Sequence, residues 1–400
     1  MDSLTQMVLG AAVGEAVLGK KLGNRAMVWG GIAGTIPDLD VIANSFLSPI
    51  DALAFHRGIT HSFVFVILTA LLLGRIVPMQ YGWKHHKTLA IASWSLLVAG
   101  IGLGIAALAG FNWQGIAAGL MVATLLAGII RKRYNSDFYV ADPAVSVREW
   151  TVFFWWTLVT HPLLDCFTTY GTQMLLPFSD YRISFNNIAV ADPFYTLPFL
   201  TFLIAAAFKV SDSRLRSRLN WIGIGISSAY MLLTITNKQI VNYKMEQSLN
   251  QMGESYKRYM TTPTILNNIL WAGIAETDTS FIYGQYSFFD RSNTFTLSEI
   301  SKNHDVVGKS LDSDYTLKTL NWFSNGYFRM VKDSESQFRF FDLRFGGFRF
   351  KSDNEDQFVF SFTLLKNAEG QFIMQKPPTR PRNGDAGEMF SALINRIKGI

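Results

Sequence analysis

The longest stretch without a charged residue or a histidine restricts this chain more than any other feature. It runs from Thr88 to Ile130, 43 residues, and its apolar character is interrupted only at Asn112-Trp113-Gln114. One membrane crossing needs about 20 apolar residues, so this stretch is long enough for two. Because lipid offers the backbone no hydrogen-bond partners, the crossings must be helical. We therefore predict a helical hairpin through the bilayer, with its turn at residues 109–114.

The rest of the sequence points to the same environment. Charged residues make up 16% of the chain, against about 25% in soluble proteins. Cys166 is the only cysteine, which excludes an intramolecular disulfide and a CxxC metal site. We expect further helices in or beside the membrane, formed by six apolar segments: 4–18, 26–36, 62–79, 151–164, 194–208 and 221–235.

Basic residues predict how these helices are oriented. The net charge of +6 comes from short basic clusters at the ends of apolar segments, within 75–87, 131–133 and 209–218. Counting crossings places these clusters on one side, which is expected to be cytoplasmic. This distribution indicates membrane topology, and we expect no nucleic-acid partner. The start of segment 62–79 and the end of segment 151–164 then lie on the outer side.

The pattern changes near residue 240, where alternating aromatic strands replace the apolar helices. FIYGQYSFF, FRFFDLRFGGFRF and FVFSFTLL are typical of β-strands, and a helix over 242–260 is expected before them. The proline-rich segment 376–385 predicts a linker, followed by an amphipathic helix over 387–397. The expected fold is mostly α: a polytopic helical membrane domain, 1–240, followed by a smaller water-exposed α+β, β-rich domain, 241–400, on the outer side.

Charged and imidazole groups beside apolar helices are costly to bury and usually serve a function. In PDLD, Asp38 and Asp40 follow an apolar helix. Their oxygens suit Zn, Mn or Mg, and the alternative is a solvated turn. In HRGITHS, His56 and His61 precede an apolar helix, and Gly58 permits a bend that turns both rings inward. The alternative there is a polar loop at the membrane surface.

Two further motifs lie inside apolar segments. His161 and Asp165 in THPLLD are four residues apart and share a helix face, a spacing that suits two ligands of one metal or a simple hydrogen bond. Glu15 in LGAAVGEAVLG either completes a metal site or pairs with a Lys or Arg. Arg57, between the two histidines of HRGITH, can hold a phosphate or pair with a carboxylate.

Together these motifs indicate one metal site. The predicted topology brings PDLD, HRGITH and HPLLD to the same outer end. A mixed set of histidines and carboxylates suits a divalent metal, Zn or Mn, with an open position for water. Such a metal lowers the pKa of bound water toward ~7 and polarises an ester or phosphoryl oxygen. The sequence has no HExxH, P-loop or GxSxG motif, which argues against zincin proteases, ATP-driven chemistry and α/β-hydrolases.

Residues 1–240 resemble the YdjM-type family of inner-membrane proteins, described as metal-dependent hydrolases and as LexA-binding and membrane-associated. The resemblance rests on MDSLTQMVLGAAVGE, PDLD, HRGITHS and THPLLD in this order. It implies hydrolase activity in the bacterial inner membrane. Gln6 stands where many such relatives have a histidine, which removes one nitrogen ligand.

A looser likeness is to zinc-dependent phospholipase C. There His161 and Asp165 match the final His-x-x-x-Asp pair of the ligand pattern, Asp38 or Asp40 an earlier Asp, and His56 or His61 the middle His.

The leading hypothesis is a membrane-embedded, metal-dependent hydrolase that acts on a phosphoester or lipid-linked substrate through a metal-activated water. The expected metal ligands are His56, His61, His161, Asp38 and Asp165. Asp40 or Glu15 is expected to act as general base or further ligand, and Arg57 to stabilise the substrate oxyanion. The alternatives are a transporter of metal ions or protons, and a non-catalytic scaffold whose C-terminal domain binds a protein partner.

Overall fold

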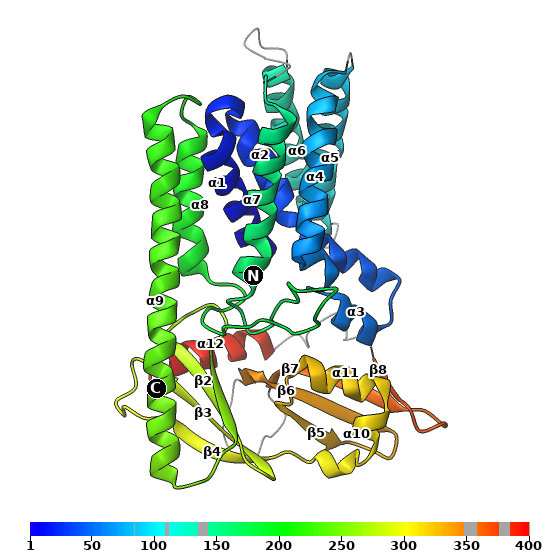
Figure 1. The fold of residues 1–400 in the computed structure, drawn as a ribbon, viewed down its shortest axis with the longest axis vertical. Coiled ribbons are helices and arrows are strands. Elements are labelled where there is room, and N and C mark those ends of the chain that lie inside the picture. The colour runs from blue at the N-terminus through cyan, green and yellow to red at the C-terminus, as the bar shows by residue number, and fades with distance from the viewer. Residues whose placement is uncertain (84, 109–111, 135–142, 348–357, 376–384, 400) are drawn as a thin grey trace.

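The structure is a computed structural model that describes residues 1–399 apart from 84, 109–111, 135–142, 348–357 and 376–384. Most of the long helices lie at one end of the long axis, and the two β-sheets lie with shorter helices at the other (Figure 1). The fold class predicted from the sequence is therefore confirmed. The elements up to the last long helix are α1 (Ser3–Leu22), α2 (Asn24–Thr35), η1 (Pro37–Ser45), α3 (Pro49–Phe55), η2 (Ile59–His61), α4 (Phe63–Tyr81), α5 (His86–Leu108), α6 (Trp113–Tyr134), α7 (Val147–Asp165), α8 (Pro193–Ala207) and α9 (Arg214–Met252).

Several of these helices match a membrane-spanning segment in length and apolar character. Within the described ranges, α4, α6 and α9 each qualify, and α2 with η1 qualifies as a span bent by 47°. The predicted hairpin corresponds to α5 packed against α6, where a Cβ on Gly102 would lie only 3.0 Å from the carbonyl oxygen of Gly119. Its predicted turn, 109–114, falls partly outside the described residues.

The first two helices approach each other closely through glycines. A Cβ added to Gly14 of α1 would lie 2.5 Å from the carbonyl oxygen of Ala26, so no side chain fits there. At the other end of α2, a Cβ on Gly34 would lie 2.6 Å from the carbonyl oxygen of Gln6. This contact brings the last turn of α2 beside the first turns of α1, where the candidate site lies.

The longest helix differs from the sequence prediction. An apolar helix ending near Ile235 and a separate helix over 242–260 were expected, but α9 is one helix of 39 residues. At 1.5 Å per residue it is about 58 Å long. Its second half leaves the helical unit and packs Val241, Met245 and Leu249 against the first β-sheet. Because its polar residues continue the helix without a glycine or proline, the predicted boundary at residue 240 falls inside a helix.

The C-terminal unit consists of two antiparallel four-stranded meanders. The first has the order β1-β2-β3-β4 and the second β5-β6-β7-β8. Aromatic and aliphatic side chains of both sheets, including Tyr283 and Phe341, form a shared core. The predicted strands correspond to β3, β6 and β7 and the predicted last helix to α12, whereas the proline-rich linker lies almost wholly outside the described residues. The elements are β1 (Arg258–Pro263), β2 (Leu270–Glu276), β3 (Ser280–Ser287), β4 (Thr296–Ser301), η3 (His304–Val306), α10 (Ser310–Ser313), α11 (Tyr315–Phe323), β5 (Phe328–Lys332), β6 (Gln337–Gly347), β7 (Phe358–Lys366), β8 (Phe372–Met374) and α12 (Asp385–Ile397).

The described residues of the C-terminal unit contact the helical unit at the end of the bundle nearest the sheets. Ile50 of α3 belongs to the core of the second sheet. The segment between α7 and α8 also contacts this unit: the ring of Tyr170 packs edge-on against Phe323 at 5.0 Å, and the hydroxyls of Thr169 and Thr262 are 2.5 Å apart. The sheets therefore lie next to the end of the bundle where α7 finishes and α4 begins.

Candidate metal centre

Four side chains from separate elements converge where the bundle meets the C-terminal unit. Asp38 belongs to η1, His61 to η2, and His161 and Asp165 to the last turns of α7. One ligand atom from each lies within 4.8 Å of the others, so this group can hold a metal ion. His61, His161 and Asp165 are fully buried, while 14% of the Asp38 side chain is exposed. These four residues are called the metal cluster below.

The distances between the imidazole nitrogens and their neighbours in the cluster are those of a tetrahedral metal site. Its two Nε2 atoms, from His61 and His161, are 3.1 Å apart. Oδ1 of Asp38 lies 3.5 Å and 3.3 Å from them, and Oδ2 of Asp165 lies 3.4 Å and 3.5 Å from them. Metal–nitrogen and metal–oxygen bonds of 2.0–2.2 Å in a tetrahedron place neighbouring ligand atoms about 3.3–3.6 Å apart.

Hydrogen bonds on the far side of each ring leave both Nε2 atoms free to accept a cation. Nδ1 of His161 lies 2.5 Å from the carbonyl oxygen of Gly34, which only accepts, so this nitrogen donates. The hydroxyl of Thr60 donates to Asp40 at 3.2 Å and accepts from Nδ1 of His61 at 3.0 Å. Each Nε2 therefore carries a lone pair, as metal-binding histidines require.

The lone pairs of the two rings face each other and two carboxylates, an arrangement that a cation stabilises. Burial lowers the pKa of His61 to about 3, so this ring is neutral at physiological pH and available as a ligand. Oδ2 of Asp165 is buried without a hydrogen-bond partner, and Nε of Arg57 lies 3.2 Å from it. The other oxygen, Oδ1, is contacted by the nitrogen of Met1 and by Nε2 of Gln6 at 2.9 Å. The donor set therefore fits a divalent metal.

The remaining residues of HRGITH and PDLD surround the cluster. Asp40 is buried and accepts from Nδ1 of His56 at 2.9 Å and from the backbone nitrogen of Arg57 at 3.0 Å. His56, an expected metal ligand, is therefore paired with Asp40 and is not among the four residues of the metal cluster. Its side chain is 27% exposed, and its ring centre is 6.2 Å from that of His61.

The bend between the two histidines differs in detail from the expected one. Arg57, not Gly58, adopts a positive φ, +59°, which is uncommon for a residue with a side chain. Its backbone bond to Asp40 stabilises this conformation. Gly58 is needed for a different reason, because a Cβ there would lie 2.7 Å from the carbonyl oxygen of Phe55. The guanidinium of Arg57 is buried and donates to Thr168 at 2.8 Å.

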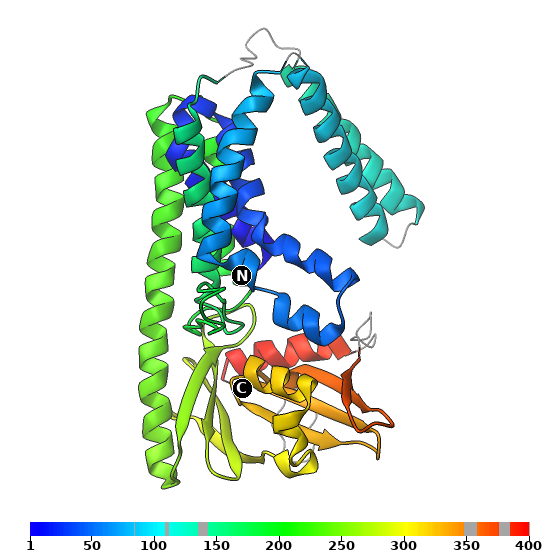
Figure 2. The same cartoon turned by 45° about the vertical axis from the view of Figure 1, so that its right-hand side comes forward.

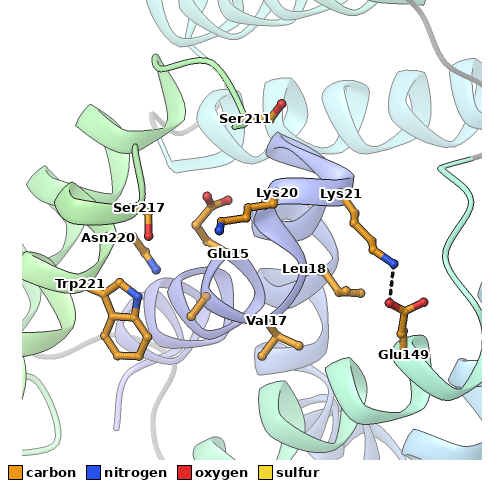
Figure 3. A pocket seen from close by; sticks show the side chains of 11 residues that line it. Glu15, Val17, Leu18, Lys20, Lys21, Glu149, Ser211, Ser217, Asn220 and Trp221 are labelled. Carbon is orange, nitrogen blue, oxygen red and sulfur yellow. Dashed lines mark hydrogen bonds and ion pairs between the residues drawn. The ribbon is translucent and has the colours of Figure 1, made fainter. Parts of the chain in front are cut away.

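Of the two expectations for Glu15, the structure shows the pair with a basic residue, which corrects its expected role as general base or ligand of the metal. Its carboxylate forms a buried ion pair with Arg216 of α9, with bonds of 2.5 and 2.6 Å. It lies nine residues beyond Gln6 on the same helix, about 13 Å along the axis. Glu15 lines a cavity of about 330 Å³ near the other end of α1. Figure 3 shows its carboxylate next to Lys20, with Trp221 elsewhere in the lining. A buried carboxylate needs a counter-charge, and Arg216, which is distant only in the sequence, provides it.

Two residues have roles at the site that the sequence analysis did not assign to them. Gln6 donates to Asp165 and, at 3.2 Å, to the carbonyl oxygen of His161, so it holds the last turn of α7. Tyr170 is flanked by two guanidinium groups, from Arg57 at 4.9 Å and Arg182 at 4.8 Å. The polar side chain of Gln6 within an apolar helix could have indicated a role at the site. Tyr170 lies in an irregular segment, where no sequence periodicity marks it.

These features define a helical membrane protein with a candidate metal centre of two histidines and two aspartates at one end of its bundle. The model of the family described as "YdjM inner membrane protein" matches residues 1–241, so the chain belongs to this family of inner membrane proteins. Comparison with curated proteins gave no significant match, and neither did comparison with solved structures. The likeness to zinc-dependent phospholipase C is thus without support from these comparisons.

Proposed function

We propose that this protein is a membrane-embedded, metal-dependent hydrolase of phosphoester or other ester bonds. The observation that carries the proposal is the convergence of two imidazole nitrogens, 3.1 Å apart, with two carboxylate oxygens that each lie 3.3–3.5 Å from both nitrogens. The proposed metal is Zn, with Mn as the second possibility, because both accept a mixed set of nitrogen and oxygen ligands. His61, His161, Asp38 and Asp165 are the proposed ligands.

The residues behind the ligands have the proposed role of fixing them. Thr60 and Asp40 orient His61, and the carbonyl oxygen of Gly34 orients His161. Asp40 is thus reassigned from general base to positioning residue, since its oxygens already accept three hydrogen bonds. Arg57 is reassigned as well: its guanidinium is buried beside Asp165, where it holds a ligand in place.

His56 is the proposed proton-transfer group. When bound, the metal supplies Lewis-acid polarisation of the scissile bond and activation of water. The attacking water forms a new bond to phosphorus or carbonyl carbon and loses a proton. The bond to the leaving oxygen breaks, and that oxygen takes up a proton. His56 is partly exposed, lies next to His61 and is held through Nδ1 by Asp40, which suits it to accept and return this proton.

The proposed orientation places the site and the C-terminal unit outside the cytoplasm. Figure 1 shows the α1–α2 turn, the end of α4 and the start of α9 at the end of the bundle far from the sheets. The basic residues Lys20, Lys21, Arg214, Arg216 and Arg218 belong to these ends. Because basic residues favour the cytoplasmic side, the opposite end, with the metal cluster, faces outward.

One observation favours a second candidate, a closed structural metal site. The cluster already offers four protein ligand atoms, and catalytic zinc sites keep one of four positions for water. Against it, the Asp38 side chain is partly exposed. Because Asp38 lies at the exposed edge of the cluster, it is the ligand that can dissociate from the metal or move to admit water as a fifth ligand.

An activity assay on matched variants separates the two candidates. The purified protein is stripped of metal, reloaded with Zn or Mn and assayed with bis(p-nitrophenyl) phosphate and p-nitrophenyl esters. We expect hydrolysis only in the loaded form. His56→Gln should keep its metal but lose about 10²–10⁴-fold in rate. His85→Gln, an exposed histidine at the other end of the bundle, is the control. A loaded wild-type protein without turnover would favour the structural site.

A further inference from the structure

The segment that follows α2 carries a row of exposed apolar side chains. Figure 2 shows this segment, in blue, leaving the bundle sideways before the chain turns down toward the sheets. A 3₁₀-helix has about three residues per turn, so residues three apart share a face. In η1, Pro37 and Asp40 are buried, whereas Leu39 and Ile42 are 55% and 58% exposed. Phe46, which is 84% exposed, follows directly.

This apolar row is continuous with a membrane segment. α2 and η1 together have the composition of a bent span, and η1 contains no Lys or Arg. Its two carboxylates turn inward, Asp38 toward the metal cluster and Asp40 toward His56. A helix that turns its carboxylates inward and exposes large apolar side chains is suited to the boundary between head groups and acyl chains.

The exposed edge of the metal cluster lies beside this row. Asp38 is the cluster residue with an exposed side chain, and the hydroxyl of Ser3 donates to it at 3.4 Å. The next residues of α1 include Leu4 and Met7, both exposed and apolar. The edge is therefore bordered by apolar surface on α1 and, through Leu39, on η1.

Aromatic side chains are exposed at the same end of the bundle. Phe178 and Tyr181, in the segment between α7 and α8, are mostly exposed. Aromatic residues of this kind gather at the level of lipid head groups. Their exposure at the end of the bundle that holds the metal cluster is the pattern of a segment beside the membrane surface.

We infer that η1 lies in the membrane–water interface and that the metal cluster takes its substrate from the bilayer. The substrate class is a lipid-like amphiphile, with its hydrolysable head group at Asp38 and its apolar chain beside Leu39, Ile42 and Phe46. The substrate part of this inference rests on the proposed function, while the placement of η1 is independent of it.

The placement is tested with nitroxide labels in nanodiscs, in a Cys166→Ser background. Labels are attached at Ile42→Cys and Phe46→Cys. Leu68→Cys, exposed on the candidate span α4, is the lipid control, and Glu335→Cys, exposed in the C-terminal unit, is the water control. The measured quantities are the accessibilities of each nitroxide to oxygen, which enters lipid, and to a water-soluble nickel complex. We expect the labels on η1 to behave like the label at Leu68, with high accessibility to oxygen and low accessibility to nickel. Labels that match Glu335, or that are shielded from both relaxants by protein, overturn the placement.

The substrate class is tested with the double variant Ile42→Ser/Phe46→Ser. Wild type and variant are loaded with metal and given bis(p-nitrophenyl) phosphate in solution and, separately, phosphatidylglycerol or phosphatidylethanolamine in vesicles. We expect the variant to keep its metal and its rate on the soluble ester. Its rate on the vesicle lipids should fall about tenfold or more, because two apolar anchors are lost.

The outcomes separate the two proposals. Equal effects of the double variant on soluble and vesicle substrates overturn the inference about the substrate, and so does hydrolysis of the soluble ester alone by wild type. A metal-loaded wild type without turnover of any substrate overturns the proposed function and the substrate class with it. The nitroxide result still decides where η1 lies.

Discussion

The hydroxyl of Thr60 offers the sharpest test of how the metal cluster is held. It accepts from Nδ1 of His61 at 3.0 Å and donates to Asp40 at 3.2 Å. In Thr60→Val the side chain keeps its shape but loses both bonds. Asp40 cannot replace the hydroxyl, because its oxygen is 3.6 Å from Nδ1. The tautomer and the orientation of His61 are then no longer fixed.

The expected loss of metal affinity follows from the role of hydrogen bonds that orient a metal-binding histidine. Removing the group that orients a metal-binding histidine lowers metal affinity by about 10–100-fold, which is about 1.4–2.8 kcal/mol. We expect Thr60→Val to bind Zn that much more weakly. The assay is a competition titration in detergent against a chromophoric chelator of known affinity.

Thr60→Ser is the matched control, because it keeps the hydroxyl and loses only a methyl group. It should bind Zn as wild type does. Equal affinity of Thr60→Val and wild type would show that the hydroxyl does not orient His61, and the reasoning from hydrogen bonds to ligand geometry would be refuted.

Three further predictions follow from other parts of the structure. Glu15→Gln leaves Arg216 buried without its counter-charge and should destabilise the fold by about 3–5 kcal/mol, lowering Tm while metal content is unchanged. The pKa of His61 is lowered by burial from 6.5 to about 3, so the unfolded chain binds a proton that the native one does not. The metal-free protein should therefore be most stable above pH 6.5 and lose up to about 1.4 kcal/mol per pH unit below it, and melting curves of His61→Gln should show a weaker pH dependence. Chelation should lower Tm, and Zn at about 100 times its Kd should restore about 2.7 kcal/mol; a Tm indifferent to metal would contradict this.

The elements that the sequence predicted best are those set by local composition. The hairpin of α5 and α6 and the strands β3, β6 and β7 follow from apolar runs and alternating aromatics, and the structure contains them. The pairing of His161 with Asp165 follows from the period of a helix. All four cluster residues come from three motifs that were recognisable because imidazole and carboxylate groups are rare in apolar surroundings.

What the sequence could not predict depends on distant contacts. Glu15 and Arg216 are 201 residues apart, and nothing local distinguishes an ion-paired glutamate from a ligand. His56 and His61 belong to one motif, and nothing within that motif indicates which ring joins the cluster. The structure shows that Asp40 pairs with His56, while His61 is the cluster residue. The continuity of α9 was missed because its composition changes from apolar to polar where it leaves the membrane unit for the sheets.

The central claim is that the cluster binds one metal ion. The most direct measurement is the metal content of the protein purified in mild detergent, by elemental mass spectrometry, for wild type, His161→Ala and the control His85→Ala. We predict about one Zn or Mn per chain in wild type and control, and none in His161→Ala. A wild-type protein that holds no metal, even after reconstitution, would contradict the account and leave the four side chains as a hydrogen-bonded group.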